Sequence, residues 1–139
     1  MIVLDTNVIS ELMKPLPDLR VVAWLDDQPP DVLFVTSVVL AELLNGIEML
    51  PEGKRKAGFR ELLDEIVTDM IGNRVLSFDA PIARTFAMIH NAARTQGVSV
   101  GFADCQIAAA AVVQGFSVAT RDTPPFTAMG CTVINPWTA

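Results

Sequence analysis

The stretch MIVLDTNVISEL, residues 1–12, joins a short apolar run directly to a helical pattern. The apolar run predicts a strand at about residues 2–5, and the residues from Thr6 onward predict a short helix that Pro15 and Pro17 end. A strand that passes at once into a helix is typical of a parallel sheet covered by helices. The opening of the chain therefore predicts an α/β fold.

The same alternation of strands and helices continues to the C-terminus. Further strands are expected at about residues 32–36, 74–78, 116–120 and 131–134. Helices are expected after the cap Asp18, from the cap Ser37 to about Leu50, between Pro51 and Gly72, from Asp79 to Gly97, and over the apolar stretch between Asp104 and Gly115. No linker, repeat or low-complexity tract divides the sequence, so we predict one domain over residues 1–139 with a mainly parallel central sheet.

Composition narrows the class of protein. Of the 139 residues, 51% are hydrophobic and 19% are charged, which is typical of a compact globular chain. The net charge of −6 argues against a dedicated nucleic-acid-binding module, so we expect no direct sequence-specific DNA binding. The negative net charge is still compatible with an enzyme that binds phosphate through a metal ion. No apolar stretch approaches the roughly 18 residues that span a membrane, and no basic segment precedes the apolar start as in a secretory signal, so we expect a cytoplasmic protein without a membrane segment.

Four acidic residues lie where a folding sequence usually avoids charge: Asp5, Glu42, Asp104 and Asp122. Burying an ionised carboxylate costs free energy unless it is paired or binds a metal. Two like charges about 4 Å apart repel by roughly 4 kcal/mol at an effective dielectric of about 20. Four such residues in one small domain therefore suggest a shared divalent cation.

The expected topology favours this convergence. Connections between parallel strands are right-handed, so the first and fourth strands can lie side by side at the point where the chain reverses the direction in which it adds strands to the sheet. Ligands bind outside the carboxyl ends of strands at such a point. Asp5 and Asp122 both follow strand ends, which would bring them together.

Each acid also has an ordinary structural explanation. Asp5 can cap the helix that follows it, Asp104 in a first helical turn meets the helix dipole favourably, and Asp122 can shape a turn. Glu42 is the hardest to explain in this way, because apolar residues flank it on both sides. The joint occurrence of all four favours a metal site over four separate explanations.

The side chains available as ligands limit which metal ion could bind. Oxygen ligands suit Mg²⁺ or Mn²⁺ better than softer metals. Zinc would be poorly served, because His90 is the only histidine and Cys105 and Cys131 form no close-spaced motif. Thr6 and Thr120 supply neutral polar groups near the same strand ends.

Several segments resemble a known family, the PIN-domain ribonucleases of the VapC type, in their FitB-like branch. The resemblance covers essentially the whole chain in order and spacing. It rests on Val3-Leu4-Asp5-Thr6-Asn7-Val8-Ile9-Ser10-Glu11, on Ala41-Glu42-Leu43 with Gly46, on Ala103-Asp104 with Ile107-Ala108-Ala109, on Ala119-Thr120-Arg121-Asp122, and on Asn135-Pro136-Trp137. Many relatives place an arginine shortly after the second acid, where this chain has Leu44-Asn45. That difference puts a partner or substrate contact by such an arginine in doubt.

The resemblance implies a three-layer α/β/α PIN fold and a Mg²⁺- or Mn²⁺-dependent endoribonuclease, the toxin of a type II toxin–antitoxin pair. It also implies a homodimer and a small antitoxin protein as partners, with RNA as the substrate. The family roles carry over to Asp5, Glu42 and Asp104 as the principal catalytic, metal-binding acids, and to Asp122 as the fourth. Thr6 and Thr120 match hydroxyl positions that orient the acids.

The leading hypothesis is hydrolysis of RNA phosphodiester bonds by a metal-activated water, with the four acids holding the metal and positioning the water. The alternative is a PIN-fold protein-interaction module with little or no turnover. A haloacid-dehalogenase-like phosphatase is disfavoured, because it would need a second aspartate where this chain has Asn7. Neither the G-x-G-x-x-G nor the P-loop signature of nucleotide-binding proteins occurs.

Overall fold

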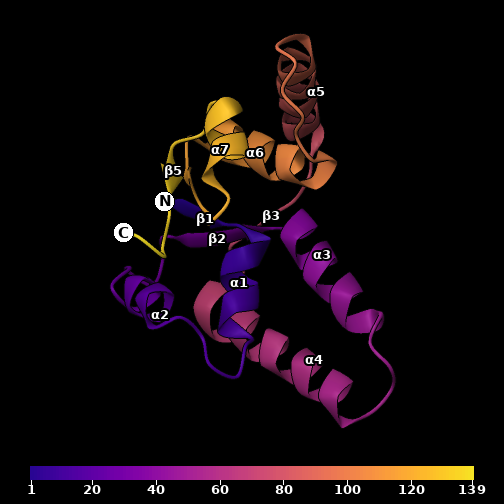
Figure 1. Cartoon of the computed structure of the whole chain (residues 1–139), viewed down its shortest axis with the longest axis vertical. Helices are drawn as coiled ribbons and strands as arrows, with labels where there is room; N and C mark the ends of the chain where they lie inside the picture. The colour runs from indigo at the N-terminus through magenta and orange to yellow at the C-terminus, as the bar shows by residue number, and fades with distance from the viewer.

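A five-stranded parallel sheet runs through the centre of the protein, in the strand order β3-β2-β1-β4-β5 (Figure 1). The computed structural model describes residues 1–139. The strands are β1 (Ile2–Leu4), β2 (Leu33–Thr36), β3 (Val75–Leu76), β4 (Ser117–Ala119) and β5 (Val133–Ile134). The helices are α1 (Thr6–Leu12), α2 (Leu19–Asp26), α3 (Ser37–Glu48), α4 (Lys54–Ile66) with the π-helical turn η1 (Val67–Ile71), α5 (Ala80–Thr95), α6 (Phe102–Gln114) and α7 (Thr123–Ala128).

The helices form a layer on each face of the sheet. Figure 1 shows α1 to α4 below the sheet and α5 to α7 above it, which gives three α/β/α layers as predicted. Because helices cover both faces, all three residues of β1 are buried. The main core joins 23 buried residues from the strands and both helix layers. No helix is long and apolar enough to cross a membrane.

β1 lies between β2 and β4, because the chain adds β2 and β3 on one side of β1 and then β4 and β5 on the other. β1 pairs with β4 in parallel, with Leu4 opposite Ala119. The next residues continue the contact, because the backbone N–H of Asp5 donates to the carbonyl of Ala119 at 2.9 Å. Asp5 and Thr120 thus leave the sheet side by side, and the predicted adjacency of the first and fourth strands is confirmed.

Most of the expected helix ends agree with the structure. Asp18 caps α2 by accepting from the backbone N–H of Arg20, and Asp79 caps α5 by accepting from that of Ile82. Gly115 ends α6 in the left-handed conformation, with φ of 70°, which glycine adopts without strain.

Three details differ from the sequence-based expectations. β1 ends at Leu4, so Asp5 lies just beyond the strand, although it is the N-cap of α1 as one interpretation of it expected. The expected cap Ser37 is wrong: the hydroxyl of Thr36 caps α3 by accepting from the N–H of Val39 at 3.1 Å. Helix α7 follows Asp122 where only a turn was expected, whereas Asp104 lies in the first turn of α6 as expected.

The cap of α3 can be tested by exchanging its hydroxyl for a methyl group. We expect Thr36→Val to lower the free energy of unfolding by about 1 kcal/mol, because the buried N–H of Val39 loses its partner. Ser37→Ala should change it by less than about 0.5 kcal/mol, because no hydrogen bond to the Ser37 hydroxyl holds the helix end. Urea denaturation measures both values. A larger cost for Ser37→Ala than for Thr36→Val would contradict this assignment.

Candidate active site

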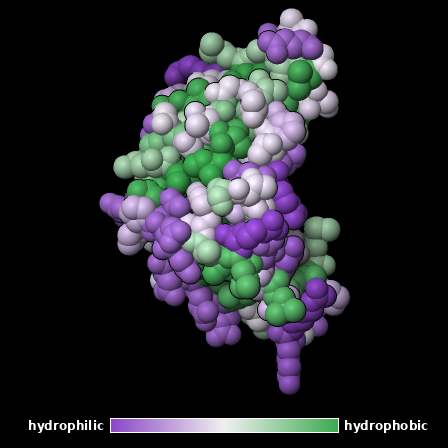
Figure 2. Space-filling model, turned by 60° about the vertical axis from the view of Figure 1, so that its left-hand side comes forward, coloured by the Kyte–Doolittle hydropathy of each residue, from purple (hydrophilic) through white to green (hydrophobic).

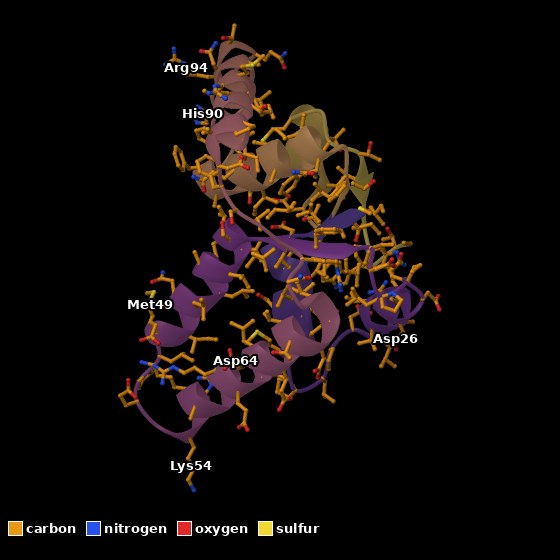
Figure 3. The ribbon with its side chains drawn as sticks, turned by 180° about the vertical axis from the view of Figure 1, so that it is seen from behind. Asp26, Met49, Lys54, Asp64, His90 and Arg94 are labelled. Carbon is orange, nitrogen blue, oxygen red and sulfur yellow. The ribbon has the colours of Figure 1, made fainter.

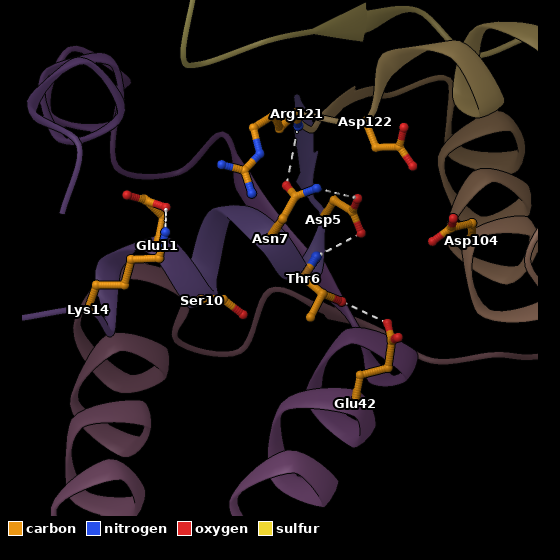
Figure 4. Close-up of a pocket in the computed structure, with 10 residues that line it drawn as sticks. All are labelled: Asp5, Thr6, Asn7, Ser10, Glu11, Lys14, Glu42, Asp104, Arg121 and Asp122. Carbon is orange, nitrogen blue, oxygen red and sulfur yellow. Dashed lines mark hydrogen bonds and ion pairs between the residues drawn. The ribbon is translucent and has the colours of Figure 1, made fainter.

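An open, polar pocket of about 310 Å³ lies just beyond the carboxyl ends of β1 and β4 (Figure 4). No hydrophobic side chain lines it. Its lining residues are Asp5, Thr6, Asn7, Ser10, Glu11, Lys14, Glu42, Asp104, Arg121 and Asp122. The structure therefore brings all four predicted acids together in one pocket, as the topology suggested.

Each of the four acids lies in, or directly before, a different helix. Asp5 and Asp122 are the N-cap residues of α1 and α7, and so follow neighbouring strands. Glu42 lies in the middle of α3, on the side of the sheet that carries α1. Asp104 lies in the first turn of α6, on the opposite side. The pocket therefore joins both helix layers at one end of the sheet.

Asp5 is the most firmly held of the acids. Its side chain is only 4% exposed. Its Oδ1 accepts from the backbone N–H of Thr6 at 2.7 Å, and its Oδ2 accepts from the Thr120 hydroxyl at 2.8 Å and from Asn7 Nδ2 at 3.3 Å. The fully buried Thr120 hydroxyl also accepts from the backbone N–H of Asp122 at 3.0 Å. One threonine thus links the first and fourth acids.

A second threonine holds Glu42. The hydroxyl of Thr6 donates to Glu42 Oε1 at 2.7 Å, which ties α3 to the start of α1. Figure 4 shows Glu42 pointing from α3 toward the pocket, with Thr6 between it and Asp5. Both threonines singled out in the sequence therefore contact the acids beside them.

The four carboxylates of the pocket have no positively charged partner within ion-pair distance. Burial, together with the negative charges of Asp5, Glu42 and Asp122, raises the pKa of Asp104 to about 6. Burial also raises the pKa of Asp5, which hydrogen bonds from Thr120 and Thr6 oppose and the charges of Glu42 and Asp122 reinforce.

The acids share the pocket without forming a closed ligand set. No three acidic, histidine or cysteine side chains of the protein lie close enough together to hold one metal ion in this conformation. Like-charged carboxylates repel one another, which opposes their close approach in the absence of a cation. The four carboxylates line one pocket, but they would have to move closer together to coordinate one metal ion.

The cysteines and the histidine lie outside this pocket. Burial raises the pKa of the Cys105 and Cys131 thiols to about 11, which keeps both protonated and unreactive near neutral pH. His90 lies on α5 and stacks against Phe86, with 5.6 Å between ring centroids. Figure 3 shows His90 and Arg94 on the part of α5 that extends away from the sheet.

The other side of the pocket carries residues that were not predicted from the sequence. Ser10, Glu11, Lys14 and Arg121 line it together with the acids. Helical spacing from Asn7 through Glu11 to Lys14 was a usable signal, because residues three or four positions apart share one face of a helix. Arg121 had only its position directly after a strand as a signal.

Burial of Asp104, together with the repulsion of its carboxylate by the other acids, predicts a gain in stability from Asp104→Asn. The pKa of Asp104 in the folded protein lies above its ordinary value of 3.8, so the folded state binds the proton more tightly than the unfolded chain. Stability should therefore fall as the pH rises from 3.8 to about 6. Above that interval, we expect metal-free Asp104→Asn to be more stable than the wild type by about 1 kcal/mol after solvent screening, or about 4 °C in Tm.

Thermal unfolding in EDTA across this pH range checks the prediction. Asp64→Asn, on the exposed face of α4, is the matched control and should leave Tm nearly unchanged. The advantage of Asp104→Asn should disappear at acidic pH, where the wild-type carboxyl is protonated. An Asp104→Asn protein that melts at or below the wild-type temperature at neutral pH would contradict the proposed repulsion.

Comparison with known proteins assigns the fold to a family. The PIN domain family matches residues 2–129. "VapC ribonuclease Y4jK" of Sinorhizobium fredii (strain NBRC 101917 / NGR234) is 48% identical over 137 residues, with 99% of this chain and 98% of the relative covered. "Toxin FitB" of Neisseria gonorrhoeae (strain ATCC 700825 / FA 1090) is 42% identical, with 99% of both chains covered.

Solved structures agree with this assignment. The chain is 42% identical to a chain of the crystal structure of FitAcB from Neisseria gonorrhoeae, with a TM-score of 0.93 and full coverage of both chains. A chain of VapBC2 from Rickettsia felis, in a complex bound to a promoter DNA fragment, gives a TM-score of 0.79 at 21% identity, with 97% of this chain and 98% of that chain covered, and supports the fold alone. The chain thus belongs to the PIN-domain family, in its group of VapC and FitB toxins.

Proposed function

We propose that this PIN-domain toxin is a Mg²⁺- or Mn²⁺-dependent endoribonuclease that hydrolyses RNA phosphodiester bonds. The convergence of four carboxylates without an internal counter-charge, in a pocket free of hydrophobic side chains, carries the proposal. A relative with 48% identity bears the name VapC ribonuclease, which favours RNA as the substrate. The expected place of action is the cytoplasm.

The donor set fits a hard divalent cation. Asp5, Glu42 and Asp104 would hold it, and Asp122 would position it or an attacking water, because all four offer only oxygen. When bound, Mg²⁺ or Mn²⁺ supplies positive charge for the phosphate and lowers the pKa of a coordinated water.

The threonines prepare two of these acids for that role. Thr120 and Thr6 fix both oxygens of Asp5, and Oδ1, which accepts only from the backbone N–H of Thr6, keeps a lone pair for a ligand. Thr6 occupies Oε1 of Glu42, so Oε2 remains free for the pocket. In this proposal the hydroxyl groups set the direction of the carboxylates before any ligand binds, which reduces the reorganisation at binding.

A small antitoxin is the expected protein partner. A groove of about 450 Å³ between α1, α3 and α4 continues from the acidic pocket, with which it shares Thr6, Ser10, Lys14 and Glu42. Five hydrophobic side chains and Arg55 line it, which suits an amphipathic peptide. The resemblance to VapC-type toxins implies such a partner, and the 42% identity to "Toxin FitB" and to the FitAcB chain supports it for this chain.

A homodimer is the expected assembly. Phe102 and Met88 are 62% and 73% exposed on α6 and α5, and Phe102 packs edge-on against Phe86. Figure 2 shows apolar side chains gathered over the upper half of the molecule, the half that α5, α6 and α7 form in Figure 1. Exposed apolar surface of this kind favours association of protein chains.

One observation favours the alternative, a PIN-fold interaction module with little or no turnover. The acids do not form a ready-made ligand set for one ion in this conformation. Titration with Mn²⁺, followed by calorimetry, separates the two functions. Binding that is lost in Asp5→Asn supports the nuclease, whereas no binding at millimolar Mn²⁺ supports the interaction module.

RNA cleavage tests the proposal directly. With Mg²⁺ or Mn²⁺ present, we expect Asp5→Ala and Asp104→Asn each to lower the cleavage rate by about 100-fold or more, because each removes a ligand of the proposed ion. EDTA should abolish cleavage by the wild type. Labelled RNA resolved on a gel measures these rates.

Asp26→Asn is the matched control, because it changes an exposed aspartate at the end of α2 and should retain the wild-type rate. Equal cleavage by the wild type and both pocket variants would contradict the mechanism and would point to a contaminating nuclease.

A further inference from the structure

The pocket has a basic side opposite its acids. Figure 4 shows Arg121, Lys14 and Glu11 on one side and Asp104 on the other, with Asp5 between them. A nucleic acid strand carries a phosphate at every nucleotide, so a strand that is cleaved at the acids must place another phosphate nearby. The four carboxylates repel that neighbouring phosphate, and the basic side attracts it.

Arg121 is held in place without using its side-chain hydrogen-bond donors. It directly follows Thr120, and its backbone N–H donates to Asn7 Oδ1 at 3.3 Å. Its guanidinium carbon lies 4.9 Å from the ring centroid of Trp137. Trp137 is only 6% exposed, and its backbone N–H donates to Asn135 Oδ1 at 3.0 Å. The C-terminal turn thus provides a fixed aromatic face for the guanidinium group.

The guanidinium group of Arg121 is also free of an acidic partner. It forms no ion pair within the chain, although it lines an acidic pocket. The acid beside it, Glu11, is already occupied by Lys14 Nζ at 2.6 Å and by the backbone N–H of Asp18 at 2.9 Å. Glu11 feels the charge of Arg121 through space, but its oxygens are bonded to Lys14 and Asp18, so the guanidinium group of Arg121 keeps its N–H donors free.

We propose that Arg121 binds the phosphate of the RNA strand that neighbours the cleaved one. This inference rests on the proposed ribonuclease function. An arginine offers a planar fork of N–H donors that matches two phosphate oxygens, and a stacked arginine loses less side-chain entropy when it binds. The residue would position the strand, and the acids opposite would act on the next linkage.

Binding of a fluorescein-labelled oligouridylate, followed by anisotropy in Ca²⁺ over a range of salt concentrations, tests the contact without requiring turnover. We expect Arg121→Gln to weaken binding about tenfold and to reduce the slope of log K against log salt by about 0.7, the value for one single-strand phosphate contact. Arg121→Lys keeps the charge but loses the fork, so it should restore the slope and only part of the affinity.

Arg84→Gln is the matched control, because Arg84 is exposed on α5 outside the pocket, and it should bind like the wild type. An Arg121→Gln variant with unchanged affinity and salt slope would overturn the proposal. Absence of measurable oligouridylate binding by the wild type would also overturn it.

A cleavable RNA then identifies the phosphate. We expect Arg121→Gln to raise KM about tenfold with little change in kcat, since it removes binding rather than a reacting group. A neutral methylphosphonate next to the cleaved linkage should impair the wild type to the same extent and should not impair Arg121→Gln further. Equal additional loss in both proteins would overturn the assignment to that phosphate. Failure of the ribonuclease function itself is distinguishable, because the wild type would then bind oligouridylate but cleave no RNA with Mg²⁺ or Mn²⁺.

Discussion

Parallel pairing between β1 and β4 is the constraint on which the pocket depends. It sets Leu4 opposite Ala119, so that Asp5 and Thr120 leave the sheet together and form a 2.8 Å hydrogen bond. The same hydroxyl accepts from the backbone N–H of Asp122. A contact between residues far apart in the sequence therefore positions the first acid, the fourth acid and the start of α7 at once. The helices α3 and α6 then bring Glu42 and Asp104 to the same place from the two faces of the sheet.

The gathering of carboxylates in one pocket lowers the stability of the folded protein. Buried Asp5 and half-buried Asp104 both have a raised pKa, and their carboxylate neighbours contribute to each shift. A structure that only had to fold would pair such groups with arginine or lysine, as this chain does for Asp18 and Glu48 elsewhere. Strain of this kind is typical of functional sites, where binding of a ligand provides the missing compensation. Arg121, on the opposite side of the pocket, keeps its charge available in the same way.

Local patterns in the sequence predicted much of the fold. The apolar runs predicted the strands, and single residues such as Asp79 and Gly115 predicted helix ends, because capping depends on neighbours within one turn. The cap of α3 was misplaced by one residue, because Thr36 and Ser37 both carry hydroxyl groups and only the backbone conformation separates them. Helix α7 was missed because Pro124 and Pro125 resemble a turn, although proline is well tolerated in a first helical turn.

The site was predictable to the level of its four acids and the two threonines beside them, and not beyond. Their convergence followed from strand order, but the distances between them depend on side-chain rotamers that no sequence pattern encodes. Arg121 was missed for a related reason, since its role depends on Trp137 in the C-terminal turn. Diffraction from a crystal soaked in Mn²⁺, with anomalous scattering to locate the ion, tests the central claim most directly. The account predicts a strong Mn²⁺ peak coordinated by carboxylate oxygens of Asp5, Glu42 and Asp104, and a pocket without Mn²⁺ at saturating concentration would contradict it.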